Sequence, residues 1–141
     1  MQRTVERMLK AHPEPPLAAA EPLTDCIKAC VECAEVCTTC ADAGVAEHTA
    51  MLEHCIRLCL DTADVCAMTA RILSRQSEPD LNLVGQAVEL CALACHACGK
   101  ECLRHSPWHA HCQICAACCQ HCADACRALI SGAAAISGVT H

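Results

Sequence analysis

Residues that belong on a buried helix face recur along this chain at alternating intervals of three and four positions. Such intervals are typical of a helix that packs one face against partner helices. Between residues 26 and 40 the face consists of Cys26, Cys30, Cys33, Cys37 and Cys40. The charged Lys28 and Glu32 lie off that face. The pattern therefore predicts a helix whose buried face carries thiols where Leu or Ile is usual.

Three further segments have the same intervals. From about residue 46 to residue 75 the face runs through Met51, Cys55, Cys59, Thr62, Cys66, Thr69 and Leu73. After a turn at residues 77–80 it runs through Leu81, Val84, Val88, Cys91, Cys95, Cys98 and Cys102. In the last segment it runs through Cys112, Cys115, Cys119, Cys122 and Cys126, with Cys118 as an additional thiol. Four helices with short connections predict an all-α fold, an antiparallel up-down-up-down four-helix bundle with a Cys-lined core.

Local signals predict where these helices begin and end. Thr24 is a candidate N-cap for the first helix, which we expect to start near residue 22 or 24. Gly44 suits the position just after its end, where left-handed geometry is common. Ser106 followed by Pro107 has the form of an N-cap and first turn, and we expect it to open the last helix.

A proline-rich stretch precedes the bundle. Residues 1–12 have the spacing of a short amphipathic helix, and prolines at positions 13, 15, 16 and 22 exclude a continuous helix from there into the bundle. We therefore expect a short N-terminal helical arm with a linker over residues 1–21. The bundle should cover residues 22–134, and residues 135–141 should form a C-terminal tail.

An antiparallel topology decides which residues meet at each end of the bundle. One end should gather a rim of soft or borderline metal ligands, namely His48, Met51, His105, His109 and His111. The opposite end should gather aliphatic residues, namely Leu23, Ile72, Leu73, Leu81, Val84, Val88, Leu129 and Ile130. We expect metal to pass through the rim while the aliphatic end stays closed. We interpret His54, His96 and His121, which lie beside the buried faces, as surface or boundary residues.

The 18 cysteines among 141 residues would ordinarily indicate a disulfide scaffold. However, the N-terminus has no apolar segment typical of a secretion signal, so we expect a cytoplasmic protein whose thiols stay reduced. Neighbours on one helix face have Cβ atoms about 5–6 Å apart, whereas a disulfide needs about 3.5–4.5 Å. Disulfides between helices remain open geometrically.

The remaining composition argues against two classes of partner. The net charge is -6, and the chain has one Trp and no Phe or Tyr, so it lacks both the basic surface and the stacking platforms of nucleic-acid-binding proteins. No run of apolar residues reaches the roughly 18 needed for a membrane span. We expect neither nucleic acid nor a membrane as a partner.

Thiols on all four helices indicate metal binding. A free buried Cys can act as a small hydrophobe, but it fills a bundle less well than Leu. Soft thiolates select Cu(I), Zn(II) or iron–sulfur clusters. A Zn(II) site of four thiolates keeps a double negative charge, and several such sites would bury several uncompensated charges. One Cu(I) per thiolate leaves the core neutral, so charge balance favours many Cu(I) ions with all 18 cysteines as candidate ligands.

One stretch has the spacing of an iron–sulfur site. Cys112, Cys115, Cys118 and Cys122 match the bacterial ferredoxin run, but Ala123 stands where that run has Pro. Because the helical intervals continue through the stretch, we interpret the match as a coincidence of dense cysteines. An iron–sulfur electron-transfer protein and a metallothionein-like buffer for Zn(II) or Cd(II) remain the alternatives. No buried face carries a carboxylate, Lys or His among its thiols, so we expect no enzyme activity.

Four Cys-lined helices with CxxxC and CxxC repeats resemble the bacterial copper storage proteins over about residues 22–131. The resemblance implies a homotetramer of four-helix bundles, each holding many Cu(I) ions in its core. Secreted members carry a signal peptide and a Met-rich opening, whereas this chain has neither and its rim is mainly His, so it resembles the cytosolic branch. The implied function is cytosolic storage or sequestration of Cu(I), with a copper chaperone as a candidate partner.

Overall fold

The computed structural model describes residues 2–133 and residue 136. Within these residues the chain forms five α-helices and one short 3-10 helix, and no strand. The elements are α1 (Gln2–Ala11), α2 (Ala20–Ala46), η1 (Ala50–Leu52), α3 (Glu53–Ser74), α4 (Leu81–His105) and α5 (Ala110–Gly132). The predicted all-α architecture, with a helical arm before the bundle, is confirmed.

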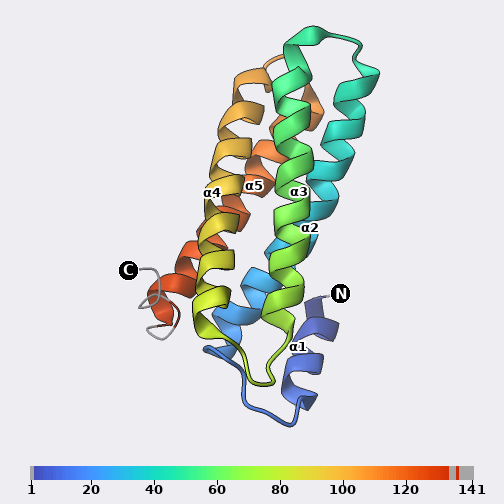
Figure 1. The fold of residues 1–141 in the computed structure, drawn as a ribbon. Coiled ribbons are helices and arrows are strands. Elements are labelled where there is room, and N and C mark those ends of the chain that lie inside the picture. The colour runs from blue at the N-terminus through green and yellow to red at the C-terminus, as the bar shows by residue number, and fades with distance from the viewer. Residues whose placement is uncertain (1, 134–135, 137–141) are drawn as a thin grey trace.

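Helices α2 to α5 lie side by side along a common axis, and α1 lies beside the lower end of the bundle in Figure 1. Helix α2 packs against α3 and α5, and α4 packs against the same two helices. Successive helices are therefore neighbours and run in opposite directions. This is the up-down-up-down arrangement that short connections favour.

The buried faces agree with the intervals in the sequence, except at Leu81, which is half-buried, and at Met51. The thiols of α2, and Cys59, Thr62, Cys66, Thr69 and Leu73 of α3, are all buried. Met51 is 70 % exposed, so its predicted place on the buried face is wrong. Residues 50–52 form the 3-10 helix η1, and the α-helical repeat begins only at Glu53. The neighbouring Leu52 is the buried residue, at 1 % exposure.

Helix α2 begins earlier than its cap signal predicts. Its first residue is Ala20, and no side chain caps it. Pro22 fits inside the first turn because no backbone N–H is needed there. Thr24 is a buried residue within the helix, so the prediction that it is the N-cap is wrong.

The predicted role of Gly44 is also wrong. Helix α2 continues to Ala46, and Gly44 is a buried helical residue without a positive φ. A Cβ atom at this position would lie 2.8 Å from Cγ1 of Ile56, so glycine lets α2 approach α3 closely. The left-handed conformation falls instead on His48, with a φ of 53°.

The prediction that Ser106 and Pro107 open the last helix is wrong. Ser106 ends α4 rather than starting α5, and its hydroxyl donates a hydrogen bond to the carbonyl of Leu103 at 2.7 Å. Pro107 lies in the turn that follows, and α5 begins at Ala110 with His109 in the N-cap position. The turn therefore holds His109 at the end of the bundle.

The end opposite this turn is closed by aliphatic side chains and by the N-terminal arm. Leu23, Leu73, Val88 and Leu129 are fully buried there. The buried side chain of Gln76 fastens the linker, because it accepts from the backbone N–H of Leu17 at 2.8 Å and donates to the Leu73 carbonyl at 2.6 Å.

The division into residues 1–21, 22–134 and 135–141 stays a prediction. The predicted end of the bundle at residue 134 lies outside the described residues. Residues 135 and 137–141 of the predicted tail also lie outside them.

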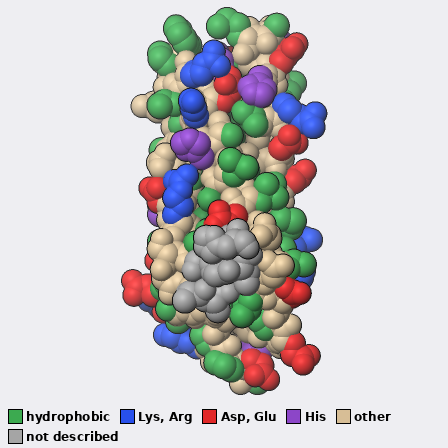
Figure 2. All heavy atoms as spheres, turned by 60° about the vertical axis from the view of Figure 1, so that its left-hand side comes forward, with side chains coloured by type: hydrophobic (Ala, Val, Ile, Leu, Met, Phe, Trp, Pro, Cys, Tyr) green, Lys and Arg blue, Asp and Glu red, His purple; other side chains and the backbone are tan. Residues whose placement is uncertain are grey.

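Helix α4 is the one described helix that is long and apolar enough to cross a membrane by length and composition. One of its faces lines the core with thiols, while Leu83, Leu90 and Leu93 are exposed. In Figure 2, which brings the α4 side of Figure 1 forward, Lys, Arg, Asp, Glu and His side chains are interspersed among hydrophobic ones. The hydropathy of α4 thus includes a buried face that belongs to the bundle core.

Candidate metal centre

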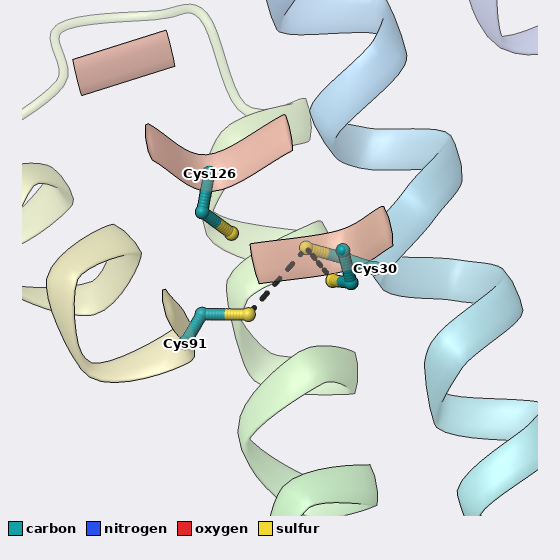
Figure 3. Close-up of side chains that lie close together, drawn as sticks. Cys30, Cys91 and Cys126 are labelled. Carbon is teal, nitrogen blue, oxygen red and sulfur yellow. Dashed lines mark hydrogen bonds between the residues drawn. The ribbon is translucent and has the colours of Figure 1, made fainter. Parts of the chain in front are cut away.

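The thiols of the four bundle helices converge on the axis of the bundle. Every cysteine except Cys118 is buried, and all 18 are free thiols. Figure 3 shows Cys30, Cys91 and Cys126 pointing toward one another from α2, α4 and α5. The Sγ atoms of Cys30 and Cys91 are 3.7 Å apart. The helical intervals therefore place the sulfur atoms in one internal column, as predicted.

Four groups of four thiols in this column have Sγ atoms that all lie within 4.8 Å of one another. They are Cys30, Cys91, Cys122 and Cys126; Cys33, Cys66, Cys95 and Cys122; Cys37, Cys98, Cys115 and Cys119; and Cys40, Cys59, Cys102 and Cys115. Cys122 belongs to two groups, and so does Cys115. Cys33 contacts Cys37 at 3.7 Å and Cys119 at 3.8 Å, and these contacts join the two groups nearer the aliphatic end to the two groups nearer the rim. The groups thus form a continuous column in which one thiolate can bridge two ions.

Two further contacts extend the column. Near the aliphatic end, Cys26 Sγ is 3.7 Å from Cys126 Sγ. Toward the rim, Cys55 Sγ is 3.5 Å from Cys102 Sγ. These separations are well beyond the S–S bond of about 2.05 Å in a disulfide, so the predicted reduced state fits the geometry.

Burial and mutual hydrogen bonding shift the acidity of these thiols in opposite directions. A hydrogen bond with Cys102 lowers the pKa of Cys55 to about 4, and one with Cys126 lowers the pKa of Cys26 to about 5. Burial raises the pKa of Cys112 to about 12. Neighbouring thiols therefore cannot all ionise together in a low-dielectric core unless cations replace their protons.

Cys118 lies at the edge of the column, packed against the buried core. It is half-buried on α5, and its Sγ donates to Glu32 Oε1 on α2 at 3.8 Å. Helix α5 is continuous through Cys112, Cys115 and Cys122. The ferredoxin spacing therefore does not form a loop around one cluster, which supports its interpretation as a coincidence.

At the rim, the column ends on a histidine. Nδ1 of His111 lies 3.3 Å from Cys40 Sγ and 3.7 Å from Cys112 Sγ, and these three residues form a further candidate metal group. On the other side of the ring, Nε2 of His111 is 2.9 Å from Glu47 Oε2. His109 Nδ1 lies 2.6 Å from the same oxygen. Residues at the end of α2 and the start of α5 thus build the rim together.

The hydrogen bonds at the rim shift the pKa values of Glu47 and His111. Hydrogen bonds with His111 and His109 lower the pKa of Glu47. Burial lowers the pKa of His111, but hydrogen bonds with Cys40 and Glu47 raise it more, so the net shift is upward. A protonated His111 is therefore stabilised until a metal ion competes for the ring.

The other predicted rim residues lie near this group but play different parts. His105 is buried, and its Nε2 is 2.9 Å from Glu101 Oε2. His48 is exposed in the turn after α2. A hollow of about 330 Å³ is lined by Glu47, Thr49, Met51, His105, Trp108 and His109. His54, His96 and His121 are exposed, as expected for surface residues.

Sequence reasoning missed three residues of this rim. Glu101 could have been recognised from its spacing of four residues before His105 on one helix. Glu47 gives no such signal, because it meets His109 and His111 across 62 and 64 residues of chain. Trp108, 71 % exposed, joins the rim only through the turn between α4 and α5.

The chain is similar to proteins of known structure. A family model described as copper storage protein matches residues 19–131. The copper storage protein Ccsp from Streptomyces lividans, solved with 10 copper equivalents, is 43% identical with a TM-score of 0.88, covering 91% of this chain and 98% of that chain. The Cu(I)-bound copper storage protein BsCsp3 is 37% identical with a TM-score of 0.66, covering 74% and 93%.

Among curated proteins, the uncharacterized cysteine-rich protein YhjQ of Bacillus subtilis (strain 168) is 38% identical over 104 residues, which are 74% of this chain and 92% of that protein. The family match spans all four bundle helices from the first turn of α2 to the last turn of α5. The chain belongs to the copper storage protein family.

Proposed function

We propose that this protein stores and sequesters many Cu(I) ions in the cytosol by binding them to the thiolates of its bundle core. The observation that carries the proposal is the continuous column in which four-thiol groups share Cys115 and Cys122. Shared thiolates suit bridged, polynuclear copper. They do not suit separate tetrahedral sites, which would each need four ligands of their own.

Charge balance supports the choice of Cu(I). Each Cu(I) that displaces one thiol proton leaves the buried thiolate neutralised, so the column can fill without accumulating charge. Zn(II) in a four-thiolate site would leave a double negative charge at each level of the column. The solved Streptomyces and BsCsp3 relatives hold copper in folds of this kind, which supports the same cargo here.

Copper passes in and out through the rim in this proposal. His111 lies directly above the outermost thiols, whereas the opposite end is filled by Leu23, Leu73 and Leu129 and covered by α1. The imidazole of His111 can hold Cu(I) transiently before thiolates take over. We expect His109 and His111 to contribute more to the rate of copper uptake than His48, which is exposed.

The cellular location, the oligomeric state and the copper donor of the protein follow the same line. A solved relative is described as a cytosolic copper storage protein from Streptomyces lividans, and this chain shares its fold. We assign a cytosolic location, a homotetrameric assembly and loading by a copper chaperone.

The test is an anaerobic competition between metals. The reduced apo-protein is titrated with Cu(I) against a Cu(I) chelator, and in parallel with Zn(II) and Cd(II). We expect colourless Cu(I) loading that neither divalent ion displaces. A preference for Zn(II) or Cd(II) would favour the metallothionein-like alternative, and a brown iron-containing product would favour electron transfer.

The uptake rim is tested by replacing His109 and His111 with Ala. We expect slower loading with an almost unchanged capacity. The matched control replaces His96 and His121, two exposed histidines within α4 and α5 and away from the rim, and should leave the rate unchanged. If both double variants load as fast as the wild type, copper does not pass through the rim.

A further inference from the structure

Glu47 occupies a position at the rim that neither copper binding nor the fold by itself explains. It is the C-cap residue of α2, and the left-handed His48 that follows turns the chain away from the helix. The carboxylate of Glu47 lies against α5, where His109 is the N-cap and His111 lies in the first turn. One side chain therefore joins the ends of two helices across the mouth of the thiol column.

Hydrogen-bond chemistry assigns the protons of both rings. An ionised carboxylate only accepts, so each ring nitrogen that faces Glu47 must donate. Oε2 accepts from Nδ1 of His109 at 2.6 Å and from Nε2 of His111 at 2.9 Å. The neutral His111 ring then carries its proton on Nε2, and the lone pair of Nδ1 accepts from the Cys40 thiol until a metal ion replaces that proton.

The Nδ1 lone pair of His111 lies beside the outermost thiols. Nδ1 of His111 is 3.3 Å from Cys40 Sγ and 3.7 Å from Cys112 Sγ. In the alternative tautomer Nδ1 would carry the proton and could not bind a metal ion. A carboxylate that holds the far nitrogen of a ligating His is a common device for fixing both the tautomer and the orientation of the ring.

We infer that Glu47 is a positioning residue, which holds His111 so that its Nδ1 joins Cys40 and Cys112 as the first resting place of incoming Cu(I). This inference rests on the proposed function and adds a named residue to it. His105 provides a contrast, since its Nε2 bonds to Glu101 within the same helix. The carboxylate that aligns a ring toward the column is therefore Glu47.

The first test needs no copper. Imidazole nitrogen-15 shifts of the reduced apo-protein report which ring nitrogen carries the proton, and are measured at about pH 8.5, above the ordinary His pKa of about 6.5. We expect the wild type to show His111 protonated on Nε2, and Glu47→Ala to show a mixture of tautomers. An unchanged His111 tautomer in Glu47→Ala would overturn the inference.

The second test measures the affinity for the first equivalent of Cu(I) against a chelator. Glu47→Ala should weaken it by about 10- to 100-fold, the usual effect of removing a residue that orients a metal ligand, with total capacity unchanged. Glu47→Gln keeps an acceptor oxygen without the charge and should lose less. The control Glu53→Gln removes one carboxylate from the exposed first turn of α3 and should match the wild type.

These measurements distinguish a failure of the role of Glu47 from a failure of the proposed copper storage. Equal first-equivalent affinities in Glu47→Ala and Glu53→Gln would overturn the role of Glu47 while leaving copper storage intact. A wild-type protein that cannot hold Cu(I) against the chelator would overturn the proposed function itself. The tautomer measurement would still report on the positioning of His111 in that case.

Discussion

Adding one thiol at Thr62 should raise the copper capacity of the column. Thr62 lies on the buried face of α3 between Cys59 and Cys66, is 1 % exposed, and interrupts the run of thiols. On one helix face, residues three and four positions apart have Cβ atoms about 5–6 Å apart, so Thr62→Cys brings a new sulfur next to both neighbours. We expect each chain to bind about one additional Cu(I), because one soft thiolate is added.

The cost in stability should be small. The Thr62 hydroxyl donates a long hydrogen bond of 3.3 Å to the carbonyl of Ala94, and losing it should cost about 0.5–1.5 kcal/mol. The matched control is Thr38→Cys, at an exposed position of α2 where the hydroxyl also donates to a backbone carbonyl, that of Ala34, at 2.7 Å. Both variants add one thiol and remove one hydrogen bond, but only Thr62 faces the column.

Native mass spectrometry after anaerobic loading and a chelator wash resolves single copper ions. Thr62→Cys should retain about one more Cu(I) than the wild type, and Thr38→Cys should retain the same number as the wild type, because an isolated exposed thiol lacks soft neighbours. The reasoning is refuted if the Thr62 variant gains nothing, or if the Thr38 variant gains as much.

Three further predictions concern the turn, the rim and the arm. His48→Gly should raise the free energy of unfolding by about 0.5–1 kcal/mol, because glycine adopts the left-handed φ of 53° without strain. The copper capacity should not change; thermal denaturation and anaerobic copper titration check both parts. The pKa of His111 is raised, so the ring gains a second proton, and can no longer bind metal through Nδ1, at a pH above the ordinary value of about 6.5. The initial loading rate should therefore fall as the pH decreases through that region. His111→Ala should abolish this dependence. A chain that lacks residues 1–19 should fold and load copper fully but melt earlier, because it loses the burial of Leu9, worth about 1.5–3 kcal/mol.

The intervals between cysteines were sufficient to predict the bundle and its thiol column, because burial of one face per helix decides both. Cys59 and Cys66 are buried for the same reason that Leu73 is. Cys118, which falls outside the alternation, is the one thiol that is only half-buried. A periodic signal therefore carried the fold and most of the site.

The details at helix ends could not be predicted, because tertiary contacts decide them. Gly44 reads locally as a helix terminator, yet the close approach of Ile56 requires glycine inside the helix, and His48 takes the left-handed turn. Met51 fits the periodicity but lies in η1, before α3 starts. The position of Glu47 over His111 depends on both turns at once, so no short-range pattern contains it.

In the proposed function, the thiol column holds Cu(I) at about one ion per thiolate. The most direct measurement is the number of Cu(I) ions that the reduced protein retains anaerobically against a chelator, with free thiols counted before and after loading. We expect a capacity close to the 18 thiols of the chain and the disappearance of nearly all free thiols on loading. Saturation at about a quarter of the thiol count would instead indicate separate four-thiolate sites and would contradict it.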